Sequence, residues 1–163
     1  MRILGIDPGL GIVGYGVIDV SREGTKAVDY GAIITPKEER LPERLLIIEK
    51  CMEEIIATYK PDEIAIEELF FFRNYTTIIP VAMARGVIVS TCYKHNKKIY
   101  EYTPLQIKQG LTGVGRAEKK QVQYMVKNVL GLDKVPTPDD VADALAVAIC
   151  HSQINPELNN NLM

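Results

Sequence analysis

Three short hydrophobic segments open the chain, and each is separated from the next by a few turn-forming residues. Residues 2–7, 12–20 and 26–35 are rich in valine, isoleucine and tyrosine, a composition typical of β-strands. A glycine-rich turn links the first two segments, and residues 21–25 link the second to the third. Because links this short join neighbouring strands that run in opposite directions, the pattern predicts an antiparallel meander.

A change of hydrophobic period marks the first long helix. After residue 40, apolar side chains recur every three or four positions, which places them along one helical stripe. Pro61 cannot continue a helix, so we expect this helix to end just before it. The members of the stripe are Leu41, Leu45, Ile48, Met52, Ile55, Ile56 and Tyr59.

The rest of the chain alternates strands with helices. We expect Thr137 to cap the last helix, with Pro138 at its first position and acidic residues near the positive end of its dipole. The fold class is therefore α/β, a five-stranded mixed sheet whose first three strands are antiparallel and which is flanked by helices. The expected later elements are strands at 63–69 and 98–103, helices at 75–95, 117–130 and 138–151, and a helical turn at 104–110.

Length and composition favour a globular protein of the cytoplasm. The 163 residues are 47% hydrophobic, which is enough for one packed core. No uninterrupted apolar stretch approaches the ~18 residues of a membrane-spanning helix, and the first residues lack the layout of a signal peptide. Cys51, Cys92 and Cys150 are odd in number and far apart, so we expect packing thiols in a reducing compartment.

The charge distribution is more informative than the net charge of −2. Residues 70–130 hold ten Lys and Arg but only two acids, a net of +8, whereas the other residues hold nine positive and nineteen negative charges, a net of −10. This asymmetry predicts a basic surface for a polyanion beside acidic groups with a separate role. The alternative is that solvated helix faces in this region are basic without binding anything.

Several acidic residues interrupt apolar segments. Asp7 ends the first strand, Glu67 and Glu68 lie together in the fourth, and Asp140 and Asp143 share one side of a helix made mostly of small apolar residues. A buried carboxylate stays charged only when it is paired or bound to a metal ion. Hard oxygen ligands of this kind suit Mg²⁺, or Mn²⁺ in its place, and two such ions about 3.5–4 Å apart serve phosphoryl chemistry.

Each acid also has a local alternative. Asp7 could cap the following turn through backbone amides, Asp140 could be an ordinary acid of a helix start, and Glu67 or Glu68 could pair with a lysine. Asp143 is harder to explain in this way because no basic residue lies within one helical turn of it. A metal mechanism needs no side-chain nucleophile, in keeping with His95 and His151, neither of which has an evident triad partner.

The collected motifs resemble the RuvC family of Holliday-junction resolvases, the crossover junction endodeoxyribonucleases of the RNase H-like superfamily. The resemblance extends from Arg2 to about Gln153, in the expected order and spacing. Its main motifs are G-I-D-P-G, A-I-E-E-L-F and P-D-D-V-A-D-A-L-A, supported by G-Y-G-V-I, A-R-G, Q-I-K-Q and A-E-K-K-Q-V-Q-Y-M-V.

The resemblance implies a homodimer that binds a four-way DNA junction and makes two symmetric nicks in homologous recombination and DNA repair. Hydrolysis is expected to require Mg²⁺ and to leave 5′-phosphate and 3′-hydroxyl ends. A branch-migration helicase is the implied partner. The family's metal-binding acids match Asp7, Glu67, Asp140 and Asp143, and this spacing selects Glu67 over Glu68 and Asp140 over Asp139.

The resemblance also implies DNA-contacting residues. Phe70 matches an aromatic wedge at the junction centre, although Phe71 could share or take over that role in the Phe70 to Phe72 run. Arg73 follows this run and could contact the DNA backbone. The basic residues expected to hold DNA near the site are Lys108, Lys119 and Lys120.

Residues 1–154 are therefore expected to form an RNase H-like nuclease domain, with 155–163 as a frayed tail and the apolar helix 75–95 as a dimer interface. Three other functions are considered. One lobe of an actin-like ATPase would need a second lobe, and a nuclease for structured RNA would keep the fold but change the substrate. A junction-binding protein without catalysis is disfavoured by the presence of all four acids.

Overall fold

A computed structural model describes residues 1–69, 75–95, 98–154 and 160–163, with side chains undescribed at 75–77. In these residues five strands form one mixed sheet in the order β3-β2-β1-β4-β5. β1 pairs with β2 and β2 with β3 in antiparallel fashion, whereas β1 with β4 and β4 with β5 are parallel. The predicted sheet is thus confirmed. The strands are β1 (Arg2–Asp7), β2 (Ile12–Ser21), β3 (Gly24–Ile34), β4 (Glu63–Glu67) and β5 (Lys98–Tyr102).

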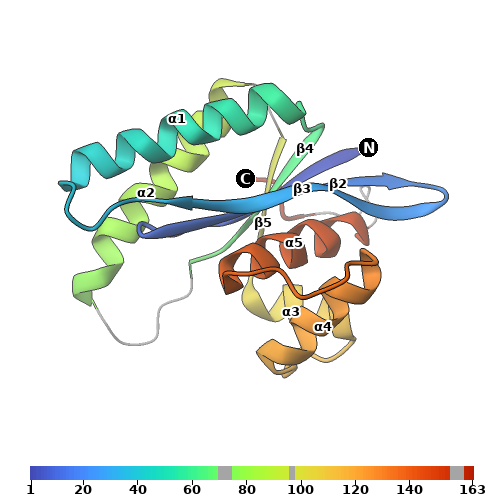
Figure 1. Ribbon diagram of the computed structural model, residues 1–163. Helices are drawn as coiled ribbons and strands as arrows, with labels where there is room; N and C mark the ends of the chain where they lie inside the picture. The colour runs from blue at the N-terminus through green and yellow to red at the C-terminus, as the bar shows by residue number, and fades with distance from the viewer. Residues whose placement is uncertain (70–74, 96–97, 155–159) are drawn as a thin grey trace.

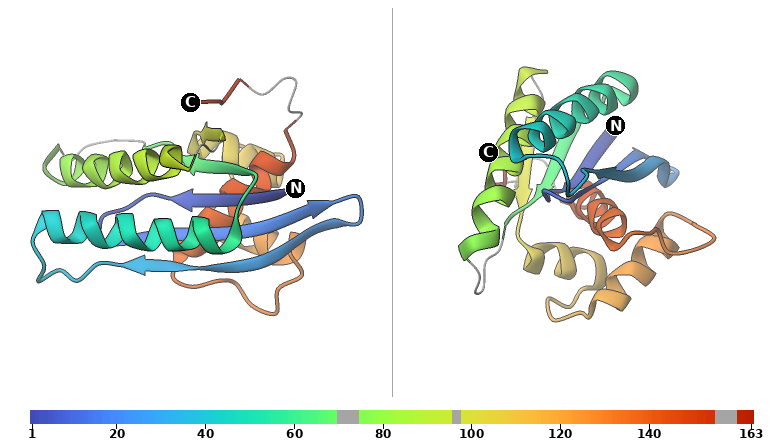
Figure 2. Two further views of the ribbon diagram at one scale, coloured as in Figure 1. Left: turned by 90° about the horizontal axis from the view of Figure 1, so that it is seen from above. Right: turned by 60° about the vertical axis from the view of Figure 1, so that its left-hand side comes forward.

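Helices cover both faces of the sheet (Figure 1). On one face α1 and α2 lie side by side, and on the other α5 crosses the sheet with α3 and α4 beyond it (Figure 2). The apolar stripe predicted for the first helix supplies its buried residues. A separate hydrophobic cluster fills each side. The helices are α1 (Leu41–Tyr59), α2 (Tyr75–Lys94), α3 (Pro104–Thr112), α4 (Lys119–Val129) and α5 (Asp139–Ser152).

Glycines in the sheet allow α5 to lie directly on it. A Cβ atom built on Gly5 would stand 2.1 Å from the carbonyl oxygen of Ala144, and one on Gly14 would stand 1.9 Å from that of Asp140. Any larger residue at these positions would push the helix away. Because Gly14 is the register partner of Asp7, this contact brings the first turn of α5 over the end of β1.

The start of α5 differs from the prediction. Pro138 is the N-cap, after a cis Thr137–Pro138 peptide bond, and the first helical residue is Asp139. Thr137 therefore does not cap the helix, and in the described residues no side-chain hydrogen bond caps it. Asp139 and Asp140 lie in the first turn, where their negative charge is favourable next to the positive end of the helix dipole.

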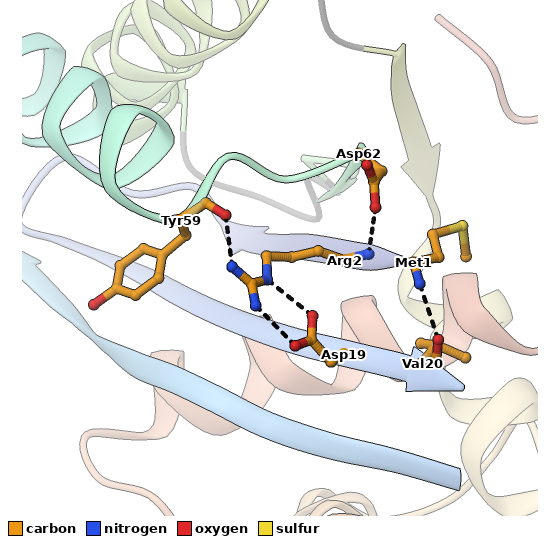
Figure 3. Close-up of polar contacts among 6 residues, drawn as sticks. All are labelled: Met1, Arg2, Asp19, Val20, Tyr59 and Asp62. Carbon is orange, nitrogen blue, oxygen red and sulfur yellow. Dashed lines mark hydrogen bonds and ion pairs between the residues drawn. The ribbon is translucent and has the colours of Figure 1, made fainter. Parts of the chain in front are cut away.

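Polar contacts tie down the start of the chain at the end of the sheet away from Asp7. The Arg2 guanidinium donates two hydrogen bonds of 2.8 Å to Asp19 and one of 3.0 Å to the carbonyl oxygen of Tyr59 (Figure 3). The backbone amide of Arg2 donates to Asp62 at 2.6 Å. One residue thus links β1, β2, the end of α1 and the approach to β4.

The expected fraying of the tail does not hold for its last residues. The amide of Glu101 donates to the carbonyl oxygen of Asn161 at 2.8 Å, and the amide of Met163 donates to that of Ile99 at 2.9 Å. The end of the chain thereby covers the otherwise open edge of β5. Residues 155–159 lie outside the described residues. No helix in the described part of the chain is long and apolar enough to cross a membrane.

Candidate active site

Two of the predicted acids end adjacent parallel strands. Ile6 of β1 is the register partner of Ile66 of β4, so Asp7 and Glu67 follow at the same edge of the sheet. Glu68 has left the strand, and its backbone amide donates to the carbonyl oxygen of Tyr102 at 2.8 Å. The fold thus places Glu67 beside Asp7, as the motif spacing predicts.

The other two acids come from α5. Asp140 and Asp143 lie three residues apart on the helix and therefore project from the same side. The close approach at Gly14 holds this side over the end of β1. All four predicted acids are thereby brought together from three segments that are distant in sequence.

Burial and mutual repulsion raise the pKa values of the clustered carboxyl groups. Burial, followed by repulsion from Glu67, Asp143 and Asp140, raises the pKa of Asp7 from 3.8 to about 8. Burial and repulsion from Asp143 raise the pKa of Glu67 to about 7. Burial also raises the pKa of Asp143. A cluster of partly buried acids that disfavour one another's charge is costly for folding and is typical of a functional site.

A lysine from another helix partly offsets this negative charge. The Lys119 ammonium lies 3.0 Å from an Asp143 oxygen and 3.3 Å from an Asp139 oxygen. Asp143 has no basic neighbour along α5, as expected, but the tertiary structure supplies one from α4. Asp139 was not among the predicted site residues, and it also accepts a hydrogen bond of 3.0 Å from the Gln123 amide nitrogen.

A cavity of about 230 Å³ opens beside the carboxylates. Its polar lining comes from Glu67, Asp143, Lys108 and Lys119, two negative and two positive residues. The rest of the wall is apolar, which strengthens electrostatic interactions inside it. Lys108 acts on the cluster as well, because its charge opposes the rise in the pKa of Glu67. The remaining lining residues are Pro104, Ile107, Val122 and Ala146.

The donor set suits a hard divalent cation. Four carboxylates act on one another at this edge of the sheet. The alternative role of Asp7 as a turn cap is not seen, because among the described residues neither Gly9 nor Leu10 donates a hydrogen bond to its carboxylate. No group of three or more His, Cys, Asp or Glu side chains among the described residues is close enough to enclose a metal ion. Glu67, Asp140 and Asp143 thus lie near enough to Asp7 to repel its charge, but no three of the described acids close around one point.

The remaining predicted site residues fall into two groups. Phe70 and Arg73 lie outside the described residues. Lys120 faces a neighbouring hollow of about 660 Å³ whose lining also includes Arg116 and the exposed Tyr124. Lys108 and Lys119 therefore line the cavity beside the carboxylates, whereas Lys120 lines the second hollow.

His151 has partners that the sequence did not reveal. One ring nitrogen, Nδ1, lies 2.6 Å from the Tyr102 hydroxyl, and the other, Nε2, lies 2.8 Å from a Glu63 oxygen. The ring is buried, and burial lowers its pKa despite Glu63. These contacts fasten the last turn of α5 to β4 and β5. The histidine therefore has a structural role, which the sequence could not show because Glu63 is 88 residues away.

Fold and site together define a class of protein. A β3-β2-β1-β4-β5 sheet carries acids at the ends of β1 and β4 and is crossed by a helix that adds two more. This arrangement, with lysines beside the acids, is that of an RNase H-like nuclease. The family model for "Crossover junction endodeoxyribonuclease RuvC" matches residues 3–151, so the chain belongs to the RuvC family of crossover junction endodeoxyribonucleases. Nucleases of this family are metal-dependent.

Individual relatives agree with this assignment. The RuvC of Alkaliphilus oremlandii is 59% identical over 152 residues, covering 93% of each chain. That of Petrotoga mobilis is 54% identical over 160 residues, covering 98% of each. The solved RuvC structure of Thermus thermophilus superposes with a TM-score of 0.92 at 31% identity over the full length of both chains. A second structure of the Thermus protein, "in complex with Holliday junction substrate", superposes with a TM-score of 0.90 at 29% identity.

Proposed function

We propose that this protein resolves four-way DNA junctions by cutting two strands symmetrically through metal-dependent phosphodiester hydrolysis. The observation that carries the proposal is the convergence of Asp7, Glu67, Asp140 and Asp143 at one edge of the sheet. The Thermus relative solved with a Holliday junction has the same fold over its full length, which supports the choice of substrate.

The four carboxylates would hold the metal, which we assign as Mg²⁺ at two positions, with Mn²⁺ as a substitute. When bound there, the metal would supply Lewis-acid activation of water and stabilisation of the negative charge that develops on the leaving group. The carboxylates must be ionised to act as ligands, so their raised pKa values couple metal binding to proton release. The apolar wall of the cavity limits access of water to the reacting phosphate.

Lysines beside the acids position the DNA backbone. Lys108 and Lys119 line the cavity that contains Glu67 and Asp143, so a phosphate bound by these lysines lies next to the carboxylates. Lys120 extends the basic surface into the neighbouring hollow. Phe70 is assigned as the wedge that stacks on bases at the junction centre, with Arg73 on the adjacent backbone.

Paired cuts require two active sites, and we assign a homodimer built on α2. This helix leaves large apolar side chains exposed, among them Ile79 at 66% and Tyr93 at 73%. Apolar surface of this kind on one helix is typical of an interface. Action on junctions in recombination and repair places the protein in the cytoplasm, with a branch-migration helicase as its working partner.

A direct test uses an end-labelled synthetic four-way junction. The protein should cut opposite strands at symmetric positions in Mg²⁺, leave 5′-phosphate ends, and make no cut in EDTA. A structured RNA of similar size serves as the comparison substrate. Asp7→Asn should abolish cutting while junction binding in a gel-shift assay is retained. Preferred cleavage of the RNA, or normal cutting by Asp7→Asn, would contradict the proposal.

A further inference from the structure

Lys119 occupies an unusual position for a residue expected to bind DNA. Its ammonium is engaged with the protein's own acids, Asp143 at 3.0 Å and Asp139 at 3.3 Å. Its side chain is nevertheless 52% exposed. The lysine thus touches the carboxylate cluster from the open side, where DNA would approach.

The two other lysines of this surface behave differently. Lys108 lines the same cavity and Lys120 is the next residue on α4, yet neither forms an ion pair with an acid among the described residues. The charge of Lys119 opposes the raised pKa values of Asp7 and Glu67 as well as that of Asp143. Of these three lysines, Lys119 alone is paired with an acid of the cluster.

The metal and the ammonium compete for the same negative charge. A divalent cation that takes an oxygen of Asp143 places two positive charges beside one carboxylate, and the ion pair with Lys119 is weakened by that repulsion. A lysine has a flexible stem with four carbon atoms, and this one is half exposed, so its ammonium can leave without any backbone movement. The backbone of α4 is held at its start by the hydrogen bond from the Glu118 amide to Gln121.

We propose that Lys119 is the counter-ion of the carboxylate cluster in the metal-free protein, and that metal binding releases its ammonium to the DNA backbone. The inference rests on the proposed metal-dependent function and adds to it a coupling between metal binding and DNA binding. Metal and DNA then assist each other's binding through one side chain, and the coupling is reciprocal.

The first test measures metal affinity without DNA. Free Mn²⁺ is titrated with protein and followed by electron paramagnetic resonance. Lys119→Ala should bind Mn²⁺ about fivefold more tightly than the unmodified protein, the equivalent of one surface ion pair. Lys120→Ala removes the same charge from the next residue and should change the affinity less than about twofold. Equal or weaker binding by Lys119→Ala, or an equal gain in Lys120→Ala, would overturn the inference.

The second test measures junction binding against salt concentration in EDTA and in Ca²⁺, with the strands checked on a denaturing gel to be uncut. In EDTA, Lys119→Ala and the unmodified protein should have the same slope of log affinity against log salt. In Ca²⁺ the slope of Lys119→Ala should be shallower by about one phosphate contact. An equal loss of slope in both conditions would show that Lys119 binds DNA independently of metal and would overturn the inference.

Asp143→Asn separates this inference from the proposed function. If the unmodified protein binds Mn²⁺ and Asp143→Asn does not, the metal site stands, and an unchanged affinity in Lys119→Ala then refutes the counter-ion role alone. If Asp143→Asn binds Mn²⁺ as well as the unmodified protein, the metal site itself is wrong and both proposals fall. Thermal unfolding of each variant checks that it folds.

Discussion

The carboxylate cluster should make the metal-free protein more stable when one of its acids is removed. In Asp7→Asn, a neutral amide replaces the carboxyl group with the most strongly raised pKa in the cluster. The unfolded chain ionises this group near its ordinary pKa of 3.8, whereas the folded protein keeps it protonated up to a pKa of about 8. Between these values the folded state binds more protons, so its stability falls as the pH rises.

The magnitude follows from the same two values. A pH of 7 is about three units above the pKa of Asp7 in the unfolded chain and is still below its pKa in the folded protein. Each of these units corresponds to about 1.36 kcal/mol. Asp7→Asn should therefore raise the free energy of unfolding by up to about 4 kcal/mol at pH 7 in EDTA, less whatever the site recovers by relaxation. The gain should shrink towards zero near pH 4, where the unfolded carboxyl is also protonated.

Urea denaturation in EDTA at several pH values, followed by circular dichroism, measures this effect. Asp133→Asn is the matched control, because Asp133 is exposed and the same change there should leave stability within about 0.5 kcal/mol. Saturating Mg²⁺ should stabilise the unmodified protein and reduce the difference. If Asp7→Asn were destabilising at pH 7, or its effect did not depend on pH, the carboxylates would not be repelling one another as described.

Three further predictions test the scaffold and the DNA surface. Gly14→Ala, whose new methyl group would meet the carbonyl oxygen of Asp140, should lower the free energy of unfolding by about 1–3 kcal/mol or more in urea, and an unchanged stability would show that α5 does not need this close approach. Lys108→Ala should weaken junction binding and reduce its salt slope by about one, and an unchanged slope would place this lysine away from DNA. Phe70→Ala should leave the thermal unfolding midpoint unchanged but slow junction cleavage, and a normal rate would contradict its role as a wedge.

Much of the fold could be predicted because its signals are local. The short hydrophobic segments, the stripe of α1 and the short links are all properties of neighbouring residues, and each led to the observed strand or helix. The two wrong predictions, the start of α5 and the end of the tail, occurred where tertiary contacts overruled the preferences of the local sequence. Thr137 is a good cap by residue type, but the helix starts one residue later, at Asp139. The end of the tail is polar by sequence, but its backbone pairs with the open edge of β5.

The sequence by itself singled out the residues to which we assign the chemistry. Asp7, Glu67, Asp140 and Asp143 stood out because acids in apolar segments are costly and because their spacing matches one family. Only the tertiary structure decided what surrounds them. The Lys119 ion pair and the Glu63 contact of His151 join residues on different elements, and Gly14 has meaning only where α5 lies against β2. Such contacts depend on how whole elements pack, a property that no local pattern of residues encodes.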